Sequence, residues 1–188
     1  MSRGAAGAGR GAVHLRDATS ADAGAMAELL NAIIDDGGTT AHLRPFDAAR
    51  MQRHYISPPL AISCFLAEKS GTVLGFQALE WCDPDWPGPD RLPPDWAVIA
   101  SFVSAAARGR GIGGALFARS RKAALGAGVR AIDATIRADN PAGLGFYASI
   151  GFFPYARMAA VPLSNGVGVD RIRKRYELGV KPGQARPA

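Results

Sequence analysis

A glycine-rich segment, AAARGRGIGGAL at residues 105–116, interrupts the chain between an apolar run and a stretch with helical periodicity. Glycine permits positive φ angles and close approach of other groups, although each one weakens a regular element by about 0.5 to 1 kcal/mol. A strand, a glycine-rich turn and a helix in this order leave several backbone N–H groups without helical partners, and the helix dipole adds partial positive charge there. The segment therefore predicts an anion-binding turn, with phosphate as the natural ligand.

Two common phosphate-binding loops do not account for this turn. The Walker pattern GxxxxGK[ST] does not occur in the sequence. The Rossmann pattern GxGxxG fits only as a rearrangement, without an acidic residue closing a parallel strand about 20 residues further on. The letters from Arg108 to Gly113 instead fit the hexapeptide Arg/Gln-x-x-Gly-x-Gly/Ala.

Strand and helix signals on both sides of the turn predict an α/β fold with a mixed sheet, because hairpins and crossovers both occur. The first helix is expected to be capped by Ser20 or Asp22 and to end at the DDGG sequence, and Asn140 followed by a proline is expected to begin the last one. Prolines make residues 82–95 a long loop. The other predicted elements are helices at 47–56 and 111–128, and strands at 13–19, in both halves of 62–81, and at 96–103, 131–136, 152–162 and 168–178.

Length and composition favour one soluble domain at residues 13–178, with flexible tails at 1–12 and 179–188. The chain has 188 residues, of which 48% are hydrophobic. It has no run of 18 apolar residues and no apolar core of a signal peptide at its start, so we expect a cytoplasmic protein without a membrane partner. Cys64 and Cys82 lack metal-ligand spacing and are expected to be reduced thiols, with no metal site.

The net charge of +6 raises the alternative of a nucleic-acid binder. The basic residues are spread over both tails, the segment RSRK at 119–122 and the segment RIRKR at 171–175. The last segment alternates around Ile172, which favours a strand with one solvated basic face. We therefore expect no nucleic-acid partner, and binding of nucleic acid with a steep salt dependence would overturn this expectation.

Two motifs together resemble the GNAT superfamily of N-acetyltransferases. The hexapeptide from Arg108 resembles that family's coenzyme A pyrophosphate loop, and NPAGLGFYASIGF at 140–152 resembles its segment Asn-x-x-x-x-x-Phe-Tyr-x-x-x-Gly-Phe. The resemblance spans residues 13–178 and looks strongest to the branch of phosphinothricin and methionine sulfone acetyltransferases. It implies a single-domain fold with a mixed sheet of about six or seven strands flanked by about four helices, and a homodimer.

By this resemblance, acetyl-CoA is the co-substrate and the glycine-rich turn holds its pyrophosphate. The strand that ends at Phe102 and Val103 would pair with the pantetheine arm, and Asn140 would contact pantetheine or cap its helix. The cofactor-binding residues so implied are Phe102, Val103, Arg108, Gly109, Arg110, Gly111, Ile112, Gly113, Gly114, Asn140 and Tyr147.

The resemblance also implies that Tyr147 gives a proton to the departing thiolate; the alternative is a core aromatic, since Leu144, Tyr147 and Ile150 share helical spacing. The family branch carries a glutamate on the strand before the loop, where this sequence has Val98 or Ile99. Glu80 at the end of the preceding strand is the best substitute as general base, followed by Asp83.

The acceptor site is expected to involve two loops, IIDDGGTTAHLRPF and the proline-rich one. We predict direct transfer of acetyl to the amine of a small, amino-acid-like molecule within a ternary complex. The missing glutamate favours an alternative, a coenzyme-A-binding sensor domain without turnover. The predicted catalytic residues are Tyr147 and Glu80, and the predicted substrate-binding residues are Thr39, Thr40, Arg44 and Trp81, with Trp86 and Trp96 nearby.

Overall fold

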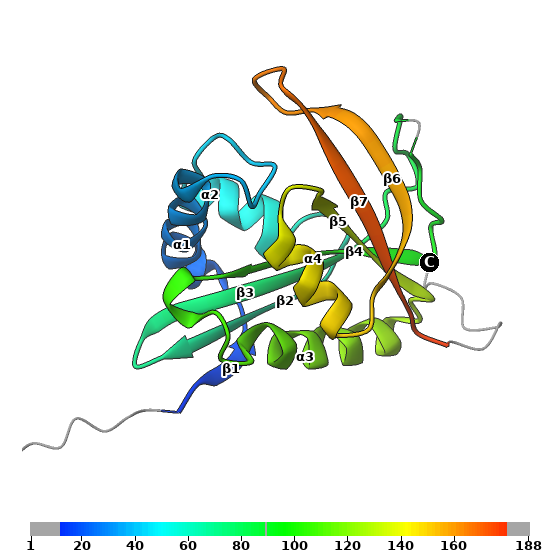
Figure 1. The fold of residues 1–188 in the computed structure, drawn as a ribbon. Coiled ribbons are helices and arrows are strands. Elements are labelled where there is room, and N and C mark those ends of the chain that lie inside the picture. The colour runs from blue at the N-terminus through cyan, green and yellow to red at the C-terminus, as the bar shows by residue number, and fades with distance from the viewer. Residues whose placement is uncertain (1–11, 89, 180–188) are drawn as a thin grey trace, which may run out of the picture.

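A computed structural model describes residues 12–88 and 90–179 of the chain. The tails predicted at 1–12 and 179–188 lie outside these ranges except for residues 12 and 179. The described residues form one seven-stranded sheet with helices on both faces (Figure 1). The predicted class, an α/β fold with a mixed sheet and four α-helices, is confirmed.

The strand order in the sheet is β1-β2-β3-β4-β5-β7-β6. All neighbours are antiparallel except β4 and β5, which run parallel. The strands are β1 (His14–Asp17), β2 (Ala61–Lys69), β3 (Thr72–Trp81), β4 (Trp96–Val103), β5 (Ala131–Arg137), β6 (Phe153–Pro162) and β7 (Gly168–Glu177).

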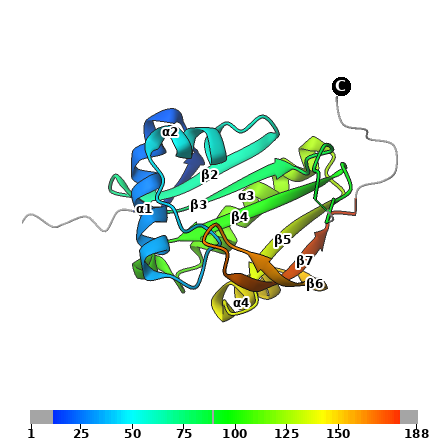
Figure 2. The same cartoon turned by 90° about the horizontal axis from the view of Figure 1, so that it is seen from above.

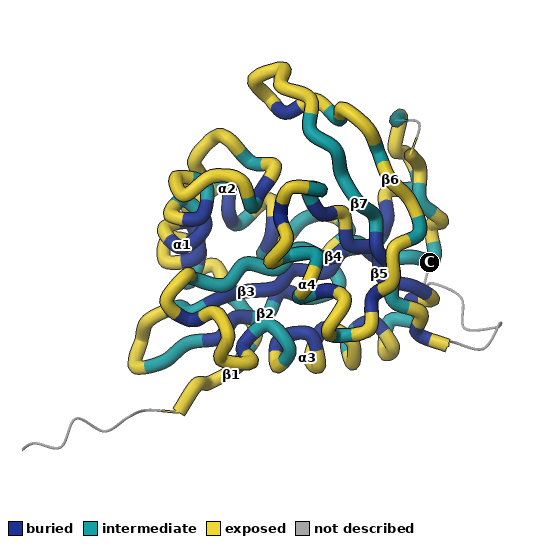
Figure 3. Tube along the Cα trace, in the orientation of Figure 1, coloured by how far each residue is buried: buried dark blue, intermediate teal, exposed yellow. Residues whose placement is uncertain are grey.

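Two pairs of helices cover opposite faces of the sheet (Figure 2). One core packs α1 and α2 against the face of β2 and β3 that carries Leu66 and Phe76. The other packs α3 and α4 against the face that carries Leu79 and Ile132. Figure 3 shows buried residues concentrated in the central strands, whereas the β6–β7 hairpin is mostly exposed or half-buried. The helices are α1 (Ala23–Asp36), α2 (Ala48–Met51), α3 (Ile112–Ala127) and α4 (Pro141–Ser149).

Two helices differ in detail from the sequence prediction. The first begins with a 3-10 turn at Ser20–Asp22, where the Asp22 carboxylate accepts hydrogen bonds from the Thr19 backbone N–H (2.8 Å) and hydroxyl (2.9 Å). Thr19 is the N-cap of this turn, and Asp22, one of the two predicted caps, is the N-cap of α1, although its side chain makes no capping hydrogen bond to α1. The helix predicted at 47–56 is α-helical only to Met51 and continues as a π-helical turn at Gln52–Ile56.

The β2–β3 hairpin turns at the predicted residues. Ser70 has a φ of 50° and Gly71 a φ of 79°, which are the positive angles that a two-residue turn of this twist requires. None of the helices in residues 12–88 and 90–179 is long and apolar enough to cross a membrane.

A gap opens in the sheet between β4 and β5. The two strands pair only from Trp96 to Val98 on β4, opposite Ala131 to Asp133 on β5. On its other edge β4 stays paired with β3 as far as Val103. The last five residues of β4 therefore present backbone N–H and C=O groups toward a neighbouring strand that has moved away.

Candidate active site

The glycine turn, residues 108–114, connects β4 to α3 through a 3-10 turn at Ala105–Ala107. Gly109 and Gly111 have φ angles of 73° and 76°, and Gly111 is the N-cap of α3. A Cβ atom built at either position meets nothing within 4 Å. These two glycines are needed for the backbone conformation, and the space beside them is open.

The backbone N–H groups of residues 109–114 in the glycine turn find no acceptor in the part of the chain that the structure describes. Among the described residues, no hydrogen bond has an N–H of residues 109–114 as donor, and the first N–H that finds a carbonyl is that of Ala115, at 3.0 Å from the oxygen of Gly111. Arg108 to Gly111 are exposed to solvent. A set of free N–H groups at the start of a 16-residue helix is a site for an oxyanion such as phosphate.

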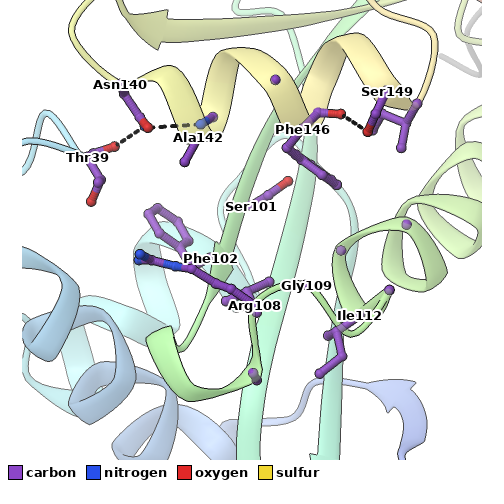
Figure 4. A pocket seen from close by; sticks show the side chains of 18 of the residues that line it. Thr39, Ser101, Phe102, Arg108, Gly109, Ile112, Asn140, Ala142, Phe146 and Ser149 are labelled. Atoms are coloured by element: carbon purple, nitrogen blue, oxygen red, sulfur yellow. Dashed lines mark hydrogen bonds between the residues drawn. The ribbon is translucent and has the colours of Figure 1, made fainter.

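A cavity of about 560 Å³, here called the turn cavity, opens beside these N–H groups. Figure 4 shows Phe146 of α4 and Asn140, the residue before α4, on one side, Phe102 and Arg108 on the other, and Ser101 between them. The cavity therefore extends from the glycine turn to the gap between β4 and β5. The predicted cofactor-binding residues that line it are Phe102, Val103, Arg108, Gly109, Gly111, Ile112, Gly113, Gly114 and Asn140.

Close packing shapes the wall formed by α3 and α4. A Cβ atom at Gly113 would come within 2.7 Å of the Phe146 ring, so glycine at this position allows the two helices to meet. Arg110 is exposed and is not one of the residues that line the turn cavity.

Asn140 connects the start of α4 to the α1–α2 connection. Its side-chain oxygen accepts a hydrogen bond from the N–H of Gly143 at 2.9 Å, which caps α4. Its side-chain nitrogen donates to the carbonyl oxygen of Thr39 at 3.0 Å, which ties the α1–α2 connection to the rim of the cavity. The capping function proposed from the sequence is thus present.

We expect Asn140→Ala to lower the free energy of unfolding by about 1 to 2 kcal/mol, because the cap and the bond to Thr39 are both lost. Chemical denaturation measures this change. Asn165→Ala, in the exposed β6–β7 turn, is the matched control and should cost clearly less. Equal effects of the two substitutions would contradict a special role of Asn140 in holding the rim.

Tyr147 ends a buried chain of polar groups. Its hydroxyl lies 2.9 Å from the hydroxyl of Ser101, which in turn accepts a hydrogen bond of 2.7 Å from the side-chain nitrogen of Gln77. Gln77 and Ser101 face each other on β3 and β4, and Gln77 is fully buried. Burial raises the pKa of Tyr147 to about 12, while the bond to Ser101 opposes this shift.

Either hydroxyl of the Ser101–Tyr147 pair can be the donor. Because Gln77 donates to the Ser101 oxygen, the Ser101 proton can be donated to the Tyr147 oxygen. Ser101 lines the turn cavity, whereas the buried Tyr147 is not one of the residues that line it. Tyr147 also packs in the second core against Phe146 and Phe152, as the core-aromatic alternative predicts, while its function as proton donor stays a prediction.

A second cavity of about 360 Å³, here called the sheet cavity, is lined by the preceding residues of β4, Val98 to Ala100. Glu80 lines it and is the register partner of Val98. Directly paired residues on neighbouring strands point to the same face of a sheet. Glu80 therefore places its carboxyl group beside the position where the sequence comparison expected a glutamate. Burial, and second the charge of Asp83, raise the pKa of Glu80.

Other ionisable groups line the sheet cavity beside Glu80. Asp133 on β5 is 1% exposed and accepts hydrogen bonds from the hydroxyls of Tyr155 (2.5 Å) and Thr135 (2.9 Å), while burial raises its pKa. The remaining polar lining comes from Arg171 on β7 and from His54 and Tyr55 of the π-helical turn.

The predicted substrate-binding residues lie in different places. Thr39 lines the turn cavity. The buried Thr40 accepts a hydrogen bond at its carbonyl oxygen from Arg137 at 3.3 Å. Arg44 is exposed in the connection between α1 and α2. Trp81 packs against the second core, on the face opposite to that of Glu80, because successive side chains of a strand alternate.

Sequence reasoning did not identify Ser101, Gln77, Asp133 or Arg171 as site residues. For Ser101 and Gln77 a signal was available, because each is a polar residue within a mostly apolar strand. A buried polar group needs a hydrogen-bond partner, so each of them indicated a polar contact inside the fold. RIRKR forms a strand as predicted, but its Arg173 side chain is only 15% exposed. The guanidinium donates to the carbonyl oxygen of Asp90 in the proline-rich loop at 3.1 Å, so this face is not simply solvated.

A family model described as the acetyltransferase (GNAT) family matches residues 24–152, more than half of the chain. The chain belongs to this family. Membership identifies the GNAT domain as an acyltransferase and confirms the resemblance seen in the two sequence motifs. A comparison with curated proteins gave no match.

Solved structures share the fold of this GNAT domain. A phosphinothricin acetyltransferase from Sinorhizobium meliloti, in complex with acetyl-CoA, is 22% identical with a TM-score of 0.73, and 93% of each chain is covered. A GCN5-related N-acetyltransferase from Kribbella flavida is 25% identical with a TM-score of 0.70, covering 88% of this chain and 97% of that one. An N-acetyltransferase from Staphylococcus aureus Mu50 is 22% identical with a TM-score of 0.72, covering 89% and 99%.

Proposed function

We propose that this GNAT domain is an acetyl-CoA-dependent N-acetyltransferase that acts on the amine of a small molecule by direct transfer in a ternary complex. The observation that carries the proposal is the arrangement of two cavities around β4. The free N–H groups of residues 109–114 open on the turn cavity, and Glu80 lines the sheet cavity. Consecutive residues of β4 line the two cavities, at the point where β4 separates from β5.

The residues of the turn cavity fit coenzyme A. The N–H groups of 109–114 suit a pyrophosphate, and the exposed Arg108 and Arg110 can add charge-assisted hydrogen bonds. The edge of β4 from Ile99 to Val103 offers backbone groups to the amides of a pantetheine arm. When bound, acetyl-CoA supplies the acetyl group as a thioester with a thiol leaving group.

Two side chains then move the protons of the reaction. Glu80 accepts a proton from the acceptor ammonium, directly or through a water molecule, so that the amine nitrogen can form a bond to the acyl carbon. The carbon–sulfur bond breaks, and Tyr147 donates its proton to the sulfur while Ser101 stabilises the phenolate by donation. A backbone N–H near Phe102 polarises the thioester carbonyl. The nitrogen loses its second proton to solvent as the carbon–sulfur bond breaks, and the phenolate takes its proton back from solvent.

The cysteines support direct transfer rather than a covalent acetyl-cysteine. Cys64 and Cys82 are both buried, and burial raises the pKa of each thiol to about 12. A thiol with such a pKa carries little thiolate at neutral pH, and the thiolate is the nucleophilic form. Neither residue lines the turn cavity or the sheet cavity.

Release of free thiol from acetyl-CoA, measured with a panel of amino acids, methionine sulfone, phosphinothricin, polyamines and aminoglycosides, tests the proposal. Turnover with an amine is the expected result. Coenzyme A binding without turnover on the panel would favour the sensor alternative. The likeness to a phosphinothricin acetyltransferase supports an amino-acid-like acceptor; a homodimer and a cytoplasmic location stay predictions.

We expect Glu80→Gln to lower kcat/KM about 100-fold at neutral pH, because the base is lost. Burial raises the pKa of Glu80, so the wild-type rate should fall on the acid side at a pH above the usual range of a glutamate, and the variant should lack this limb. Asp83 contributes to the raised pKa, so Asp83→Asn should move the limb to lower pH and retain activity. A pH–rate profile unchanged by Glu80→Gln would exclude Glu80 as the base.

A further inference from the structure

Arg171 is a cation of the sheet cavity for which the described residues provide no counter-ion. It lies on β7 and lines the cavity together with Glu80. In the ranges 12–88 and 90–179 its guanidinium forms no ion pair with a carboxylate and no hydrogen bond, and its Nε atom is buried without a partner. Burial, and second the charge of Arg137, lower the pKa of Arg171, yet an arginine stays protonated at neutral pH.

The neighbouring arginines provide an internal comparison. Arg137 is the register partner of Arg171 and pairs with Asp139 at 2.6 Å. Arg173 and Arg175 lie on the same face of β7 as Arg171, because side chains alternate along a strand. Each of them has a carboxylate as well, Asp133 at 3.9 Å and Glu177 at 2.9 Å respectively, although the buried Nε of Arg175, like that of Arg171, makes no hydrogen bond to any described residue. Arg171 alone among these four lacks a carboxylate partner in the described chain.

A half-buried guanidinium without a partner destabilises the fold unless a ligand compensates its charge. Removing a charged group from water costs free energy that an ion pair or several hydrogen bonds must offset. Asp133 is the carboxylate that lines the same cavity on β5, but it already accepts hydrogen bonds from two hydroxyl groups. Its register partner on β7 is Arg175 and not Arg171. The planar guanidinium is the side chain best suited to bind a carboxylate or another oxyanion through two parallel hydrogen bonds.

We propose that Arg171 binds an anionic group of the acetyl acceptor, so that the acceptor carries an amine toward Glu80 and a carboxylate or similar oxyanion toward β7. The inference rests on the proposed function in that it takes the sheet cavity as the acceptor site. It assigns the specificity for an anion-bearing amine to β7, whereas the sequence pointed to Arg44 in the α1–α2 connection. Arg171 in this role is a specificity determinant and takes no part in proton transfer.

Anion binding can be measured without any acetyl transfer. We would record the Nε–Hε signals of the arginines by ¹H–¹⁵N NMR and assign Arg171 by its loss in Arg171→Met. N-acetylglycine, acetate and inorganic phosphate are titrated separately, and N-acetylglycinamide serves as the uncharged analogue. We expect N-acetylglycine to shift the Arg171 signal saturably and N-acetylglycinamide to leave it in place.

A kinetic arm distinguishes failure of this inference from failure of the proposed function. For an amino acid accepted in the thiol-release assay, Arg171→Met should raise KM about tenfold or more, and the same substitution should change KM for the corresponding carboxamide less than about twofold. Arg171→Lys keeps the charge and should recover part of the loss. Arg157→Met removes an exposed arginine from β6 and should change neither substrate.

The NMR titration and the kinetic comparison together decide between the inference and the proposed function. A saturable shift of Arg171 together with the acid-specific rise in KM supports the inference. A shift without turnover on any amine would overturn the proposed acetyl transfer and leave the anion site standing. An Arg171 signal that none of the three anions moves at tens of millimolar overturns the inference, as does a shift confined to Arg137 or Arg173. If Arg171→Met does not fold, Arg171→Lys provides the assignment and the kinetic comparison.

Discussion

Gly111→Val is expected to weaken the binding of coenzyme A by more than about 100-fold, as measured by isothermal titration calorimetry without an acceptor. The new side chain would project into the open space beside the glycine turn, where a Cβ atom meets nothing within 4 Å. It would occupy the region that the free N–H groups of 109–114 face. Loss of two or more charge-assisted hydrogen bonds corresponds to at least about 3 kcal/mol of binding free energy.

The positive φ of 76° at Gly111 makes a matched control necessary. A side chain in this backbone region costs about 1 to 2 kcal/mol wherever it is placed. Gly166 in the β6–β7 turn has a φ of 82° and also has open space around a Cβ atom. Gly166→Val should therefore lower the free energy of unfolding by a similar amount while leaving coenzyme A affinity unchanged.

This pair of substitutions separates the ligand-binding role of Gly111 from its conformational role. Circular dichroism and chemical denaturation establish whether the two variants are folded and equally destabilised. Unchanged affinity in a folded Gly111→Val variant would contradict the pyrophosphate assignment. Equal loss of affinity in both variants would attribute the effect to general destabilisation.

The glycine turn was predictable because its signal is local. Residues 108–114 lie within a single turn, and the same letters encode the positive φ angles and the free N–H groups. The hairpin at Ser70–Gly71 and the cap at Asn140 are local in the same sense. In such places a few consecutive residues determine the backbone conformation, so sequence reasoning identified the feature and its position.

The acceptor side was not predictable in the same way, because its geometry depends on pairing between distant strands. Glu80 faces Val98 only because β3 and β4 pair in that register. Arg171 enters the sheet cavity because β7 inserts between β5 and β6, against the order of the sequence. The letters RIRKR alone contain no indication that Arg173 and Arg175 have partners and that Arg171 does not.

The start of the first helix also depends on a distant strand. Ser20 and Asp22 can both cap a helix, and their sequence preferences do not distinguish them. Arg16 on β1 decides the outcome, because its guanidinium donates to Asp22 at 2.7 and 2.8 Å and holds the carboxylate beside Thr19. This contact also holds the pKa of Asp22 well below its usual range.

Tyr147→Phe should lower kcat about 100-fold, because the proton donor to the leaving thiolate is lost, with little change in the KM for acetyl-CoA. Burial raises the pKa of Tyr147 to about 12, so the wild-type phenol keeps its proton through the neutral range. An acid is active in its protonated form, so kcat should not decline through loss of this proton below about pH 11. Saturation kinetics by thiol release measures both quantities.

The contacts of Tyr147 add a graded test of how its proton is oriented. Ser101→Ala removes the hydroxyl that is proposed to stabilise the phenolate, and Gln77→Met removes the amide that donates to the Ser101 oxygen. Both should lower kcat by less than Tyr147→Phe and have little further effect in the Tyr147→Phe background, because they act through the phenol. Tyr176→Phe removes a hydroxyl from the same aromatic cluster and should leave kcat unchanged. Full activity of Tyr147→Phe would assign the proton to water, and additive losses would mean that Ser101 acts on the reaction by another route.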